Sequence, residues 1–188
     1  MSTARPIQTQ PSRPMEDCWS SADPLGQTLH SFRMDGVIYS RSRMTAPWGM
    51  TLPAMDGCPM FHVVTSGQAT LLLDGQDPVP LKPGEFALVP HGQGHGICSR
   101  RGVKMRHLFD LPRKEVSPRY ELIEHGGGGE ETTLICGVVR FDHPAAQDLL
   151  DLLPPIIHIQ AFSSPHADWM HSTLRLICLL YTSDAADD

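Results

Sequence analysis

Residues 84–95 read Gly-Glu-Phe-Ala-Leu-Val-Pro-His-Gly-Gln-Gly-His and follow the spacing G-x5-P-x-G-x2-H at all four fixed positions. Gly84 permits a tight turn into an apolar strand, and Pro90 ends that strand. Gly92 then leaves the backbone free to bring His95 toward the mouth of a barrel. The stretch therefore predicts two short strands joined by a turn that delivers a histidine to a candidate site.

Short strands separated by Gly and Pro extend this pattern in both directions along the chain. The sequence predicts strands that begin at Val37 and that cover about 48–52, 60–65, 68–73, 78–81, 86–89, 95–98, 103–111 and 132–141. Ser66-Gly67 is typical of a tight hairpin turn, so the strands on its two sides are expected to pair. Sixteen glycines and 17 prolines in 188 residues exceed average usage, which favours a β-sandwich or barrel.

Helices are predicted only outside this run of strands. One is expected over about 23–34, after a disordered arm formed by residues 1–22. A second begins at Pro144, and a third begins near Pro165. The apolar residues of these last two helices are expected to pack on the barrel or to form a dimer seam; they include Leu149, Leu150, Leu152, Leu153, Trp169 and Leu174.

The segment 112–131 is mostly polar and contains four successive glycines at 126–129. A phosphate-binding loop would need a G-x-x-x-x-G-K pattern or a G-x-G-x-x-G turn between a strand and a helix, and neither is present. The sequence therefore predicts a flexible loop for this segment.

The composition argues against several classes of protein. Fifteen basic against 21 acidic residues give a net charge of −6, a poor basis for nucleic-acid binding by this chain itself. No apolar run approaches the roughly 20 residues of a membrane span, and no secretory signal is visible. The five cysteines are widely spaced without a C-x-x-C pattern, so we expect reduced thiols in a cytoplasmic protein.

The spacing within 84–95 resembles the second signature of the cupin superfamily, whose members are small double-sheet barrels of the jelly-roll type. Ser99 replaces the usual terminal asparagine of that signature. The first signature is incomplete, because Met60 stands where the family has a glutamate and residues 53–56 contain no histidine for its His-x-His pair. The resemblance therefore implies a jelly-roll barrel without the ordinary cupin metal site, and no cofactor is expected.

A different metal site is the alternative. Strand alternation places His62 and Val64 on the same side of their strand, facing the barrel. His62, His91 and His95 would then converge, and three imidazoles suit zinc, nickel or iron. We favour the interpretation that His62 and His95 line a pocket as hydrogen-bonding groups while His91 is exposed in a loop, because no carboxylate is well placed beside them.

Short motifs in a fixed order widen the resemblance to about residues 23–177. They are Asp23-Pro24-Leu25, Ala46-Pro47-Trp48-Gly49, Phe61-His62-Val63-Val64, Leu88-Val89-Pro90-His91-Gly92, Cys136-Gly137, Phe141-Asp142-His143 and the leucine- and isoleucine-rich run 149–159. Together they resemble the cupin-like N-terminal regulatory domain of AraC-family bacterial transcription regulators.

This resemblance implies a mainly β fold with appended helices: a cupin-type double-stranded β-helix over about 36–142, followed by a helical hairpin over about 144–177. It also implies that a small effector binds in the barrel and that the C-terminal helices form a homodimer. In that family a separate C-terminal domain with two helix-turn-helix units contacts DNA.

We expect this DNA-binding domain to be missing because the chain is truncated. Residues 178–188 resemble translated adapter read-through and are predicted to be non-native, with a natural acidic tail as the alternative. DNA would then be bound only through the missing domain, so this chain alone is expected to have no specific DNA affinity.

The function predicted from these features is the sensing of a small molecule, without enzymatic activity. The candidate ligand-binding residues are Trp48, Met60, His62, Val64 and His95, which combine apolar surface with a few polar groups. The alternative is a metal-dependent cupin enzyme, a dioxygenase or isomerase, that uses His62, His91 and His95.

Overall fold

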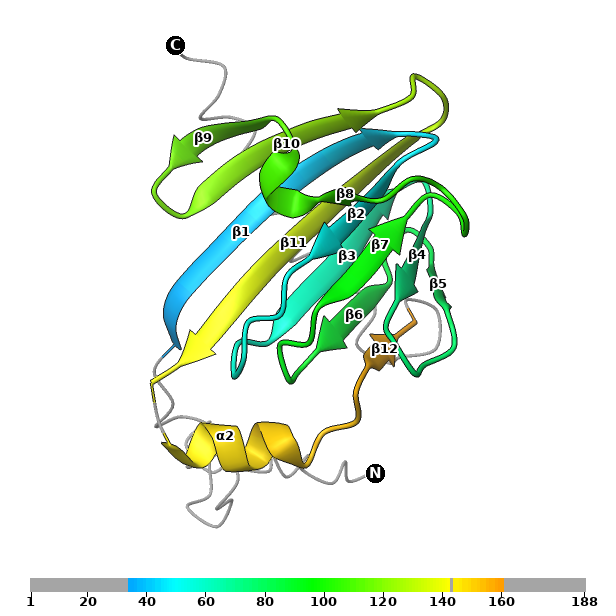
Figure 1. Ribbon diagram of the computed structural model, residues 1–188. Helices are drawn as coiled ribbons and strands as arrows, with labels where there is room; N and C mark the ends of the chain where they lie inside the picture. Colours follow the sequence, from blue (N-terminus) through cyan, green and yellow to red (C-terminus); the bar gives the residue numbers. More distant parts are fainter. Residues whose placement is uncertain (1–33, 143, 161–188) are drawn as a thin grey trace, which may run out of the picture. The chain divides into compact units, whose positions relative to one another are not determined.

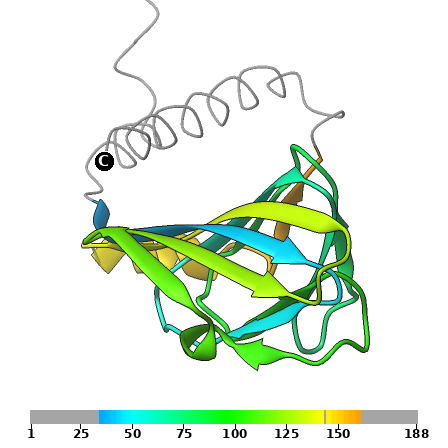
Figure 2. The ribbon, with the colours of Figure 1, turned by 90° about the horizontal axis from the view of Figure 1, so that it is seen from above.

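The computed structural model describes residues 34–142 and 144–160, which form two facing β-sheets and one short α-helix (Figures 1 and 2). The seven-stranded sheet has the order β12-β6-β3-β11-β1-β10-β9, and the five-stranded sheet has the order β5-β4-β7-β2-β8. In chain order the elements are β1 (Met34–Thr45), β2 (Gly49–Leu52), β3 (Met60–Ser66), β4 (Ala69–Leu72), β5 (Val79–Leu81), β6 (Phe86–Val89), β7 (His95–Cys98), β8 (Arg106–His107), the 3-10 helix η2 (Leu108–Asp110), β9 (Arg113–Ser117), β10 (Tyr120–Gly126), β11 (Glu131–Phe141), α2 (Pro144–Asp151) and β12 (Ile157–Ile159). The predicted mainly β fold is confirmed.

The seven-stranded sheet is built around its two longest strands, β1 and β11, which pair antiparallel. On the other side of β1, β10 runs parallel to it, with Tyr39 opposite Tyr120. β3 lies between β11 and β6 and is antiparallel to both. This order sets Cys136 of β11 directly beside His62 of β3.

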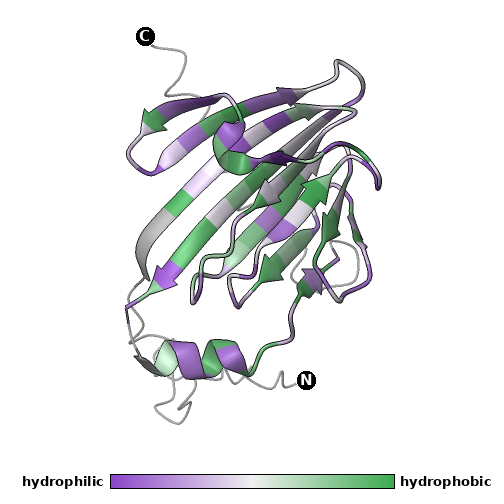
Figure 3. Ribbon diagram, in the orientation of Figure 1, coloured by the Kyte–Doolittle hydropathy of each residue, from purple (hydrophilic) through white to green (hydrophobic). Residues whose placement is uncertain are grey.

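The hydrophobic core lies between the two sheets and draws side chains from both. Met44, Met50, Val64, Leu71 and Ile97 come from five different strands, and each is almost completely buried. Burial of such side chains is the main favourable contribution to folding, at about 1.5–3 kcal/mol for each large apolar residue. Figure 3 shows the corresponding pattern: β6 is coloured as hydrophobic, whereas β9 is mostly hydrophilic.

The predicted hairpin at Ser66-Gly67 is wrong. β3 and β4 are consecutive, but β3 belongs to the seven-stranded sheet and β4 to the five-stranded sheet. Gly67 has a φ of +72°, and a Cβ there would collide with the Glu131 carbonyl oxygen. The glycine therefore turns the chain out of one sheet and into the other, so the turn residues were recognised correctly while the pairing of the strands was not.

The predicted flexible loop over 112–131 is also wrong, because β9 and β10 occupy most of it. The glycines after β10 wrap around the end of β1: the Gly127 N–H donates to the Thr45 carbonyl at 2.7 Å, and the Gly129 N–H donates to the Ala46 carbonyl at 2.8 Å. A Cβ at Gly126 would collide with the Thr45 carbonyl oxygen. The glycine run therefore permits a close approach of two backbone segments.

Three further features of the structure were not predicted from the sequence. The strand predicted over 103–111 shrinks to the two residues of β8, followed by η2. The strand β12 was not predicted, and it adds an edge to the seven-stranded sheet beside β6. Glu85, next to the turn glycine Gly84, is buried, and its Oε2 lies 3.0 Å from Nε2 of His158 on β12.

The helix predicted after residue 143 is confirmed as α2. Its apolar side is narrower than expected, since Leu150 is buried but Leu152, just beyond the helix, is 80% exposed. The helix predicted over 23–34 lies outside the described residues except for Met34, which begins β1 instead. The helix predicted from about 165, with Trp169 and Leu174, the arm 1–22 and the tail 178–188 also lie outside the described residues. Within the described part of the chain, no helix is long and apolar enough to cross a membrane.

Candidate functional site: a buried histidine pair beside an apolar cavity

The fold brings His62 and His95 together inside the barrel. His62 lies on β3 of one sheet and His95 on β7 of the other, and both side chains are buried. Their Nε2 atoms are 2.7 Å apart, and the rings meet edge to face, with centroids 5.0 Å apart at 76°. The predicted inward direction of both histidines is therefore confirmed.

The Gln93 carbonyl oxygen determines which nitrogens of His95 and His62 carry protons. His95 Nδ1 lies 2.8 Å from the Gln93 carbonyl oxygen, which can only accept, so this nitrogen carries the proton. In the neutral ring His95 Nε2 then accepts from His62 Nε2–H. His62 Nδ1 accepts in turn from the Cys136 thiol, 3.1 Å away. We refer to these groups as the Cys136–His62–His95 network, in which every ring nitrogen has a partner.

Burial keeps all three groups of this network neutral. It lowers the pKa of His62 well below its ordinary value, and electrostatic repulsion from His95 lowers it further. Burial also lowers the pKa of His95, although the hydrogen bond to the Gln93 carbonyl acts in the opposite direction. For Cys136, burial raises the pKa of the thiol to about 12. At neutral pH the network therefore holds neither an imidazolium nor a thiolate.

The residues present do not fit a cupin-type metal centre. Two nitrogens that bind one zinc ion at 2.0–2.1 Å in tetrahedral geometry would be about 3.3 Å apart, and 2.7 Å is instead a hydrogen-bond distance. His91 does not join the pair, because its Nε2–H donates to the Leu153 carbonyl at 3.0 Å. No group of three or more His, Cys, Asp or Glu side chains in residues 34–142 and 144–160 is arranged to hold a metal ion.

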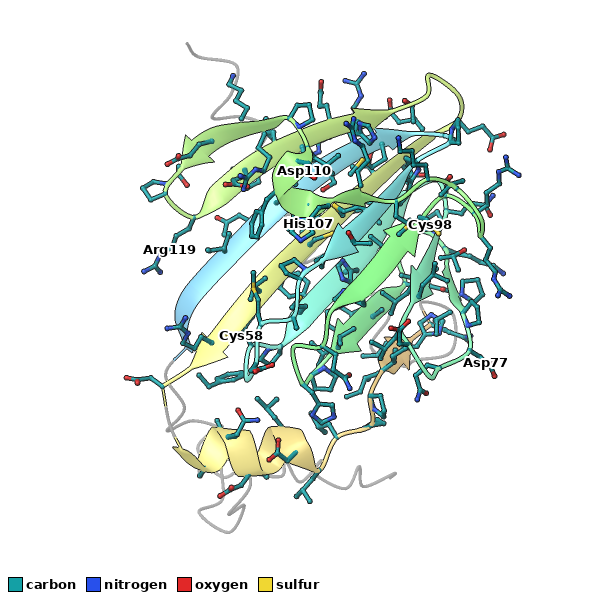
Figure 4. All side chains as sticks on the ribbon, in the orientation of Figure 1. Cys58, Asp77, Cys98, His107, Asp110 and Arg119 are labelled. Atoms are coloured by element: carbon teal, nitrogen blue, oxygen red, sulfur yellow. The ribbon has the colours of Figure 1, made fainter. Side chains whose placement is uncertain are left out.

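A cavity of about 320 Å³ lies next to this network. Its lining residues come from β1, β9, β10 and β11 of the seven-stranded sheet, from β2 and η2, and from the segment between β2 and β3. Half of its sixteen lining residues have large apolar side chains: Ile38, Met50, Leu52, Met55, Leu108, Phe109, Ile123 and Val138. Figure 4 labels Cys58, which also lines the cavity, and His107 at the start of η2.

A few polar groups are set into this apolar lining. The Arg113 guanidinium lies 3.5 Å from a carboxylate oxygen of Glu121 and 5.3 Å from the centre of the Phe109 ring. Cys136 also lines the cavity, so its thiol connects the cavity wall to the histidine pair. A mostly apolar hollow with a small number of polar groups is the usual form of a small-molecule site.

The structure separates the five predicted ligand-binding residues from this cavity. Trp48, Met60 and Val64 pack in the hydrophobic core, and His62 and His95 bond to each other; none of the five lines the cavity. Ligand binding by these residues stays a prediction.

Sequence reasoning missed Arg113, Glu121 and Ile123, because they lie in the segment predicted as a loop. The β-prone run Tyr120 to Ile123, with Glu121 and Ile123 two residues apart on one strand face, was the signal that could have identified them.

Comparison with known proteins relates the chain to one domain family and to one regulator. A family model described as Cupin matches residues 23–185. A protein of Streptomyces antibioticus named "Putative AraC-like transcription regulator" is 28% identical over 159 residues, which make up 82% of this chain and 50% of that protein. The chain therefore spans about half the length of this curated relative.

Proposed function

The chain belongs to the cupin family, and we propose that it binds a small organic molecule in its barrel as the sensing domain of an AraC-like transcription regulator. The observation that carries this proposal is the 320 Å³ cavity between the sheets, with its apolar walls and the Arg113–Glu121 pair. Its volume falls at the lower end of the range typical of small-molecule sites, about 300–1,000 Å³. The ligand is then a compact molecule with an apolar body and one polar end.

The chemistry around the cavity supports binding rather than catalysis. A nucleophilic cysteine needs a lowered pKa, whereas burial raises the pKa of the Cys136 thiol to about 12. A general base needs a free lone pair, and the acceptor nitrogens of both histidines are already engaged in the Cys136–His62–His95 network. The metal-dependent enzyme would need His91 as the third ligand beside His62 and His95. His91 Nε2–H donates instead to the Leu153 carbonyl, so this alternative has no support from the geometry.

Regulation is the other half of the proposal, and it rests on the relative. The similarity to an AraC-like regulator and the coverage of half its length support a role in which ligand binding here controls DNA binding by another domain. Homodimerisation through the C-terminal helices, with DNA contacted only outside this chain, belongs to the same proposal.

The test uses 1-anilinonaphthalene-8-sulfonate, a fluorescent probe with an apolar body and one anionic group. The Val138→Phe variant places a larger side chain on the cavity wall, and Val116→Phe makes the same change on β9, where Val116 is 47% exposed and does not line the cavity. We expect saturable fluorescence enhancement at one site in the unmodified protein and in Val116→Phe, and its loss in Val138→Phe.

Circular dichroism confirms that both variants are folded. Unchanged probe affinity in a folded Val138→Phe variant would show that the cavity is not the binding site. The same fluorescence signal then serves to screen organic molecules by displacement of the probe.

A further inference from the structure

A second hollow, distinct from the cavity, is lined by basic side chains. This pocket of about 470 Å³ is formed by the segment between β7 and β8, the end of β10, and Pro47 and Trp48 before β2. Its charged and titratable residues are Arg100, Lys104, Arg106 and His125, and no acidic residue lines it. We call it the basic pocket; it shares no lining residue with the cavity.

The positive charges of the basic pocket have no acidic partner within residues 34–142 and 144–160. Among the described residues, Arg100, Lys104 and Arg106 form no ion pair with a carboxylate. Glu130 and Glu131 line a neighbouring hollow that also includes Arg100, so Lys104 and Arg106 are the residues specific to the basic pocket.

The environment of His125 agrees with this excess of positive charge. Burial lowers the pKa of His125, and the second cause is the positive charge of Arg106. Positive groups therefore come close together here without an acidic residue between them. Such an arrangement creates a local positive potential that attracts anions.

Trp48 is the aromatic residue among those that line the basic pocket. Its side chain is buried, it lines the basic pocket, and its indole Nε1–H has no hydrogen-bond partner among the described residues. The Trp48 backbone N–H donates to the Ser99 hydroxyl at 3.1 Å, and that hydroxyl donates to the Trp48 carbonyl, also at 3.1 Å. Because the indole donor is itself inaccessible to solvent, recognition of an anion in the basic pocket rests on Arg100, Lys104 and Arg106.

We propose that the basic pocket binds a small, multiply charged oxyanion of the diphosphate or tricarboxylate class. Several cations in one concave site favour more than one negative charge, and guanidinium groups match phosphate and carboxylate geometry. The chain as a whole carries a net charge of −6, so a local concave site favours a small anion over a long polyanion. The site is separate from the cavity and does not depend on the proposed function.

The test is isothermal titration calorimetry with pyrophosphate, at pH 7.5, without divalent cations and at ionic strength held constant with sodium chloride. Lys104→Gln and Arg106→Gln each remove one charge from the basic pocket. Lys114→Gln, on β9, removes one charge from an exposed residue outside it. All three side chains are exposed, so the fold is expected to persist, and circular dichroism checks this.

We expect one pyrophosphate site per chain, with the dissociation constant raised about tenfold by Lys104→Gln and by Arg106→Gln and unchanged by Lys114→Gln, as for the loss of one charged hydrogen bond. Val138→Phe is expected to leave pyrophosphate binding intact, which separates this site from the cavity. Absence of binding, or equal weakening by all three charge substitutions, would overturn the proposal in favour of non-specific attraction.

Discussion

The two halves of the barrel interior are filled differently. Between β3 and β6 on one side and β4 and β7 on the other, side chains such as Met60, Val64 and Leu71 pack without exposure around the histidine pair; we call this the filled half. Between β1, β10 and β11 on one side and β2 and η2 on the other lies the 320 Å³ cavity; we call this the hollow half. Cys136 belongs to both, because it contacts His62 and lines the cavity.

The difference follows from the unequal widths of the two sheets. The five-stranded sheet ends at β8, which has only two residues, while the seven-stranded sheet continues through β10 to β9. Beyond β2, the described residues that line the cavity outside the seven-stranded sheet come from the short helix η2 and from the segment between β2 and β3. A polar group in the filled half must therefore find its partner within the protein, whereas the hollow half has room for one from outside.

The largest effect is expected from removing the centre of the filled half. His62→Ala would leave a void and would remove the partners of both His95 Nε2 and the Cys136 thiol. We expect the free energy of unfolding to fall by about 3–5 kcal/mol, as for other buried groups that lose packing and hydrogen bonds together. Urea denaturation followed by circular dichroism measures this. His125→Ala, outside the network, is the control and should cost less than about 1 kcal/mol; equal losses would contradict the distinction.

One substitution made in each half compares them directly. Val64→Phe adds volume where the side chain is fully buried, and we expect it to cost about 1–3 kcal/mol through overpacking. Val138→Phe adds the same atoms next to the cavity, and we expect a change of less than about 1 kcal/mol because the ring has space to enter. Thermal unfolding of the two variants gives the comparison, and a larger loss in Val138→Phe would mean that the cavity is not open to a ring.

The filled half also predicts how stability depends on pH. The pKa values of His62 and His95 are both lowered in the folded protein, so the unfolded chain binds protons first as the pH falls. Their contribution to stability is complete above the unfolded pKa of about 6.5 and is lost as the pH falls toward the folded values.

Between pH 7.5 and 5.5 we therefore expect the free energy of unfolding to decrease by about 1–2 kcal/mol, measured in urea at both pH values. His95→Gln is expected to reduce this decrease, and His107→Asn, at an exposed histidine, is expected to preserve it. A decrease that is the same in all three proteins would assign it to other groups.

The sequence predicted strand bounds and side-chain directions correctly where side chains pack in the core. The strand bounds 86–89 and 95–98, the start of α2 at Pro144 and the inward direction of His62 and His95 were all predicted, because apolar alternation and Pro or Gly at the strand ends are local signals. The pairing partners were not predictable in this way. β3 pairs with β6 and with β11, which lies about 70 residues later in the chain, and the turn residues at Gly67 indicate neither partner.

The hollow half was missed for a related reason. β9 is exposed along its whole length, so its residues show no hydrophobic alternation, and it is a strand only because its backbone pairs with β10. The parallel pairing of β10 with β1 is equally invisible in a local sequence window. Sequence patterns mark the residues that fill a core, whereas a cavity is defined by the space that they leave.

The smallest effect on stability is expected at the mouth of the hollow half. The Arg113–Glu121 ion pair is about one-third exposed on each side, so Glu121→Gln should change the free energy of unfolding by less than about 1 kcal/mol. The same substitution should have a clearer effect on ligand binding than on stability, because loss of the carboxylate leaves the Arg113 guanidinium at the cavity wall without its acidic partner. We therefore expect roughly 2- to 5-fold tighter binding of 1-anilinonaphthalene-8-sulfonate, because its sulfonate can pair with the Arg113 guanidinium.

Glu124→Gln is the matched control. Glu124 pairs with Arg43, is 70% exposed and does not line the cavity, so this substitution removes the same charge without changing the cavity. Equal tightening in both variants would attribute the effect to net charge, and no tightening in Glu121→Gln would remove Arg113 from the ligand-binding surface.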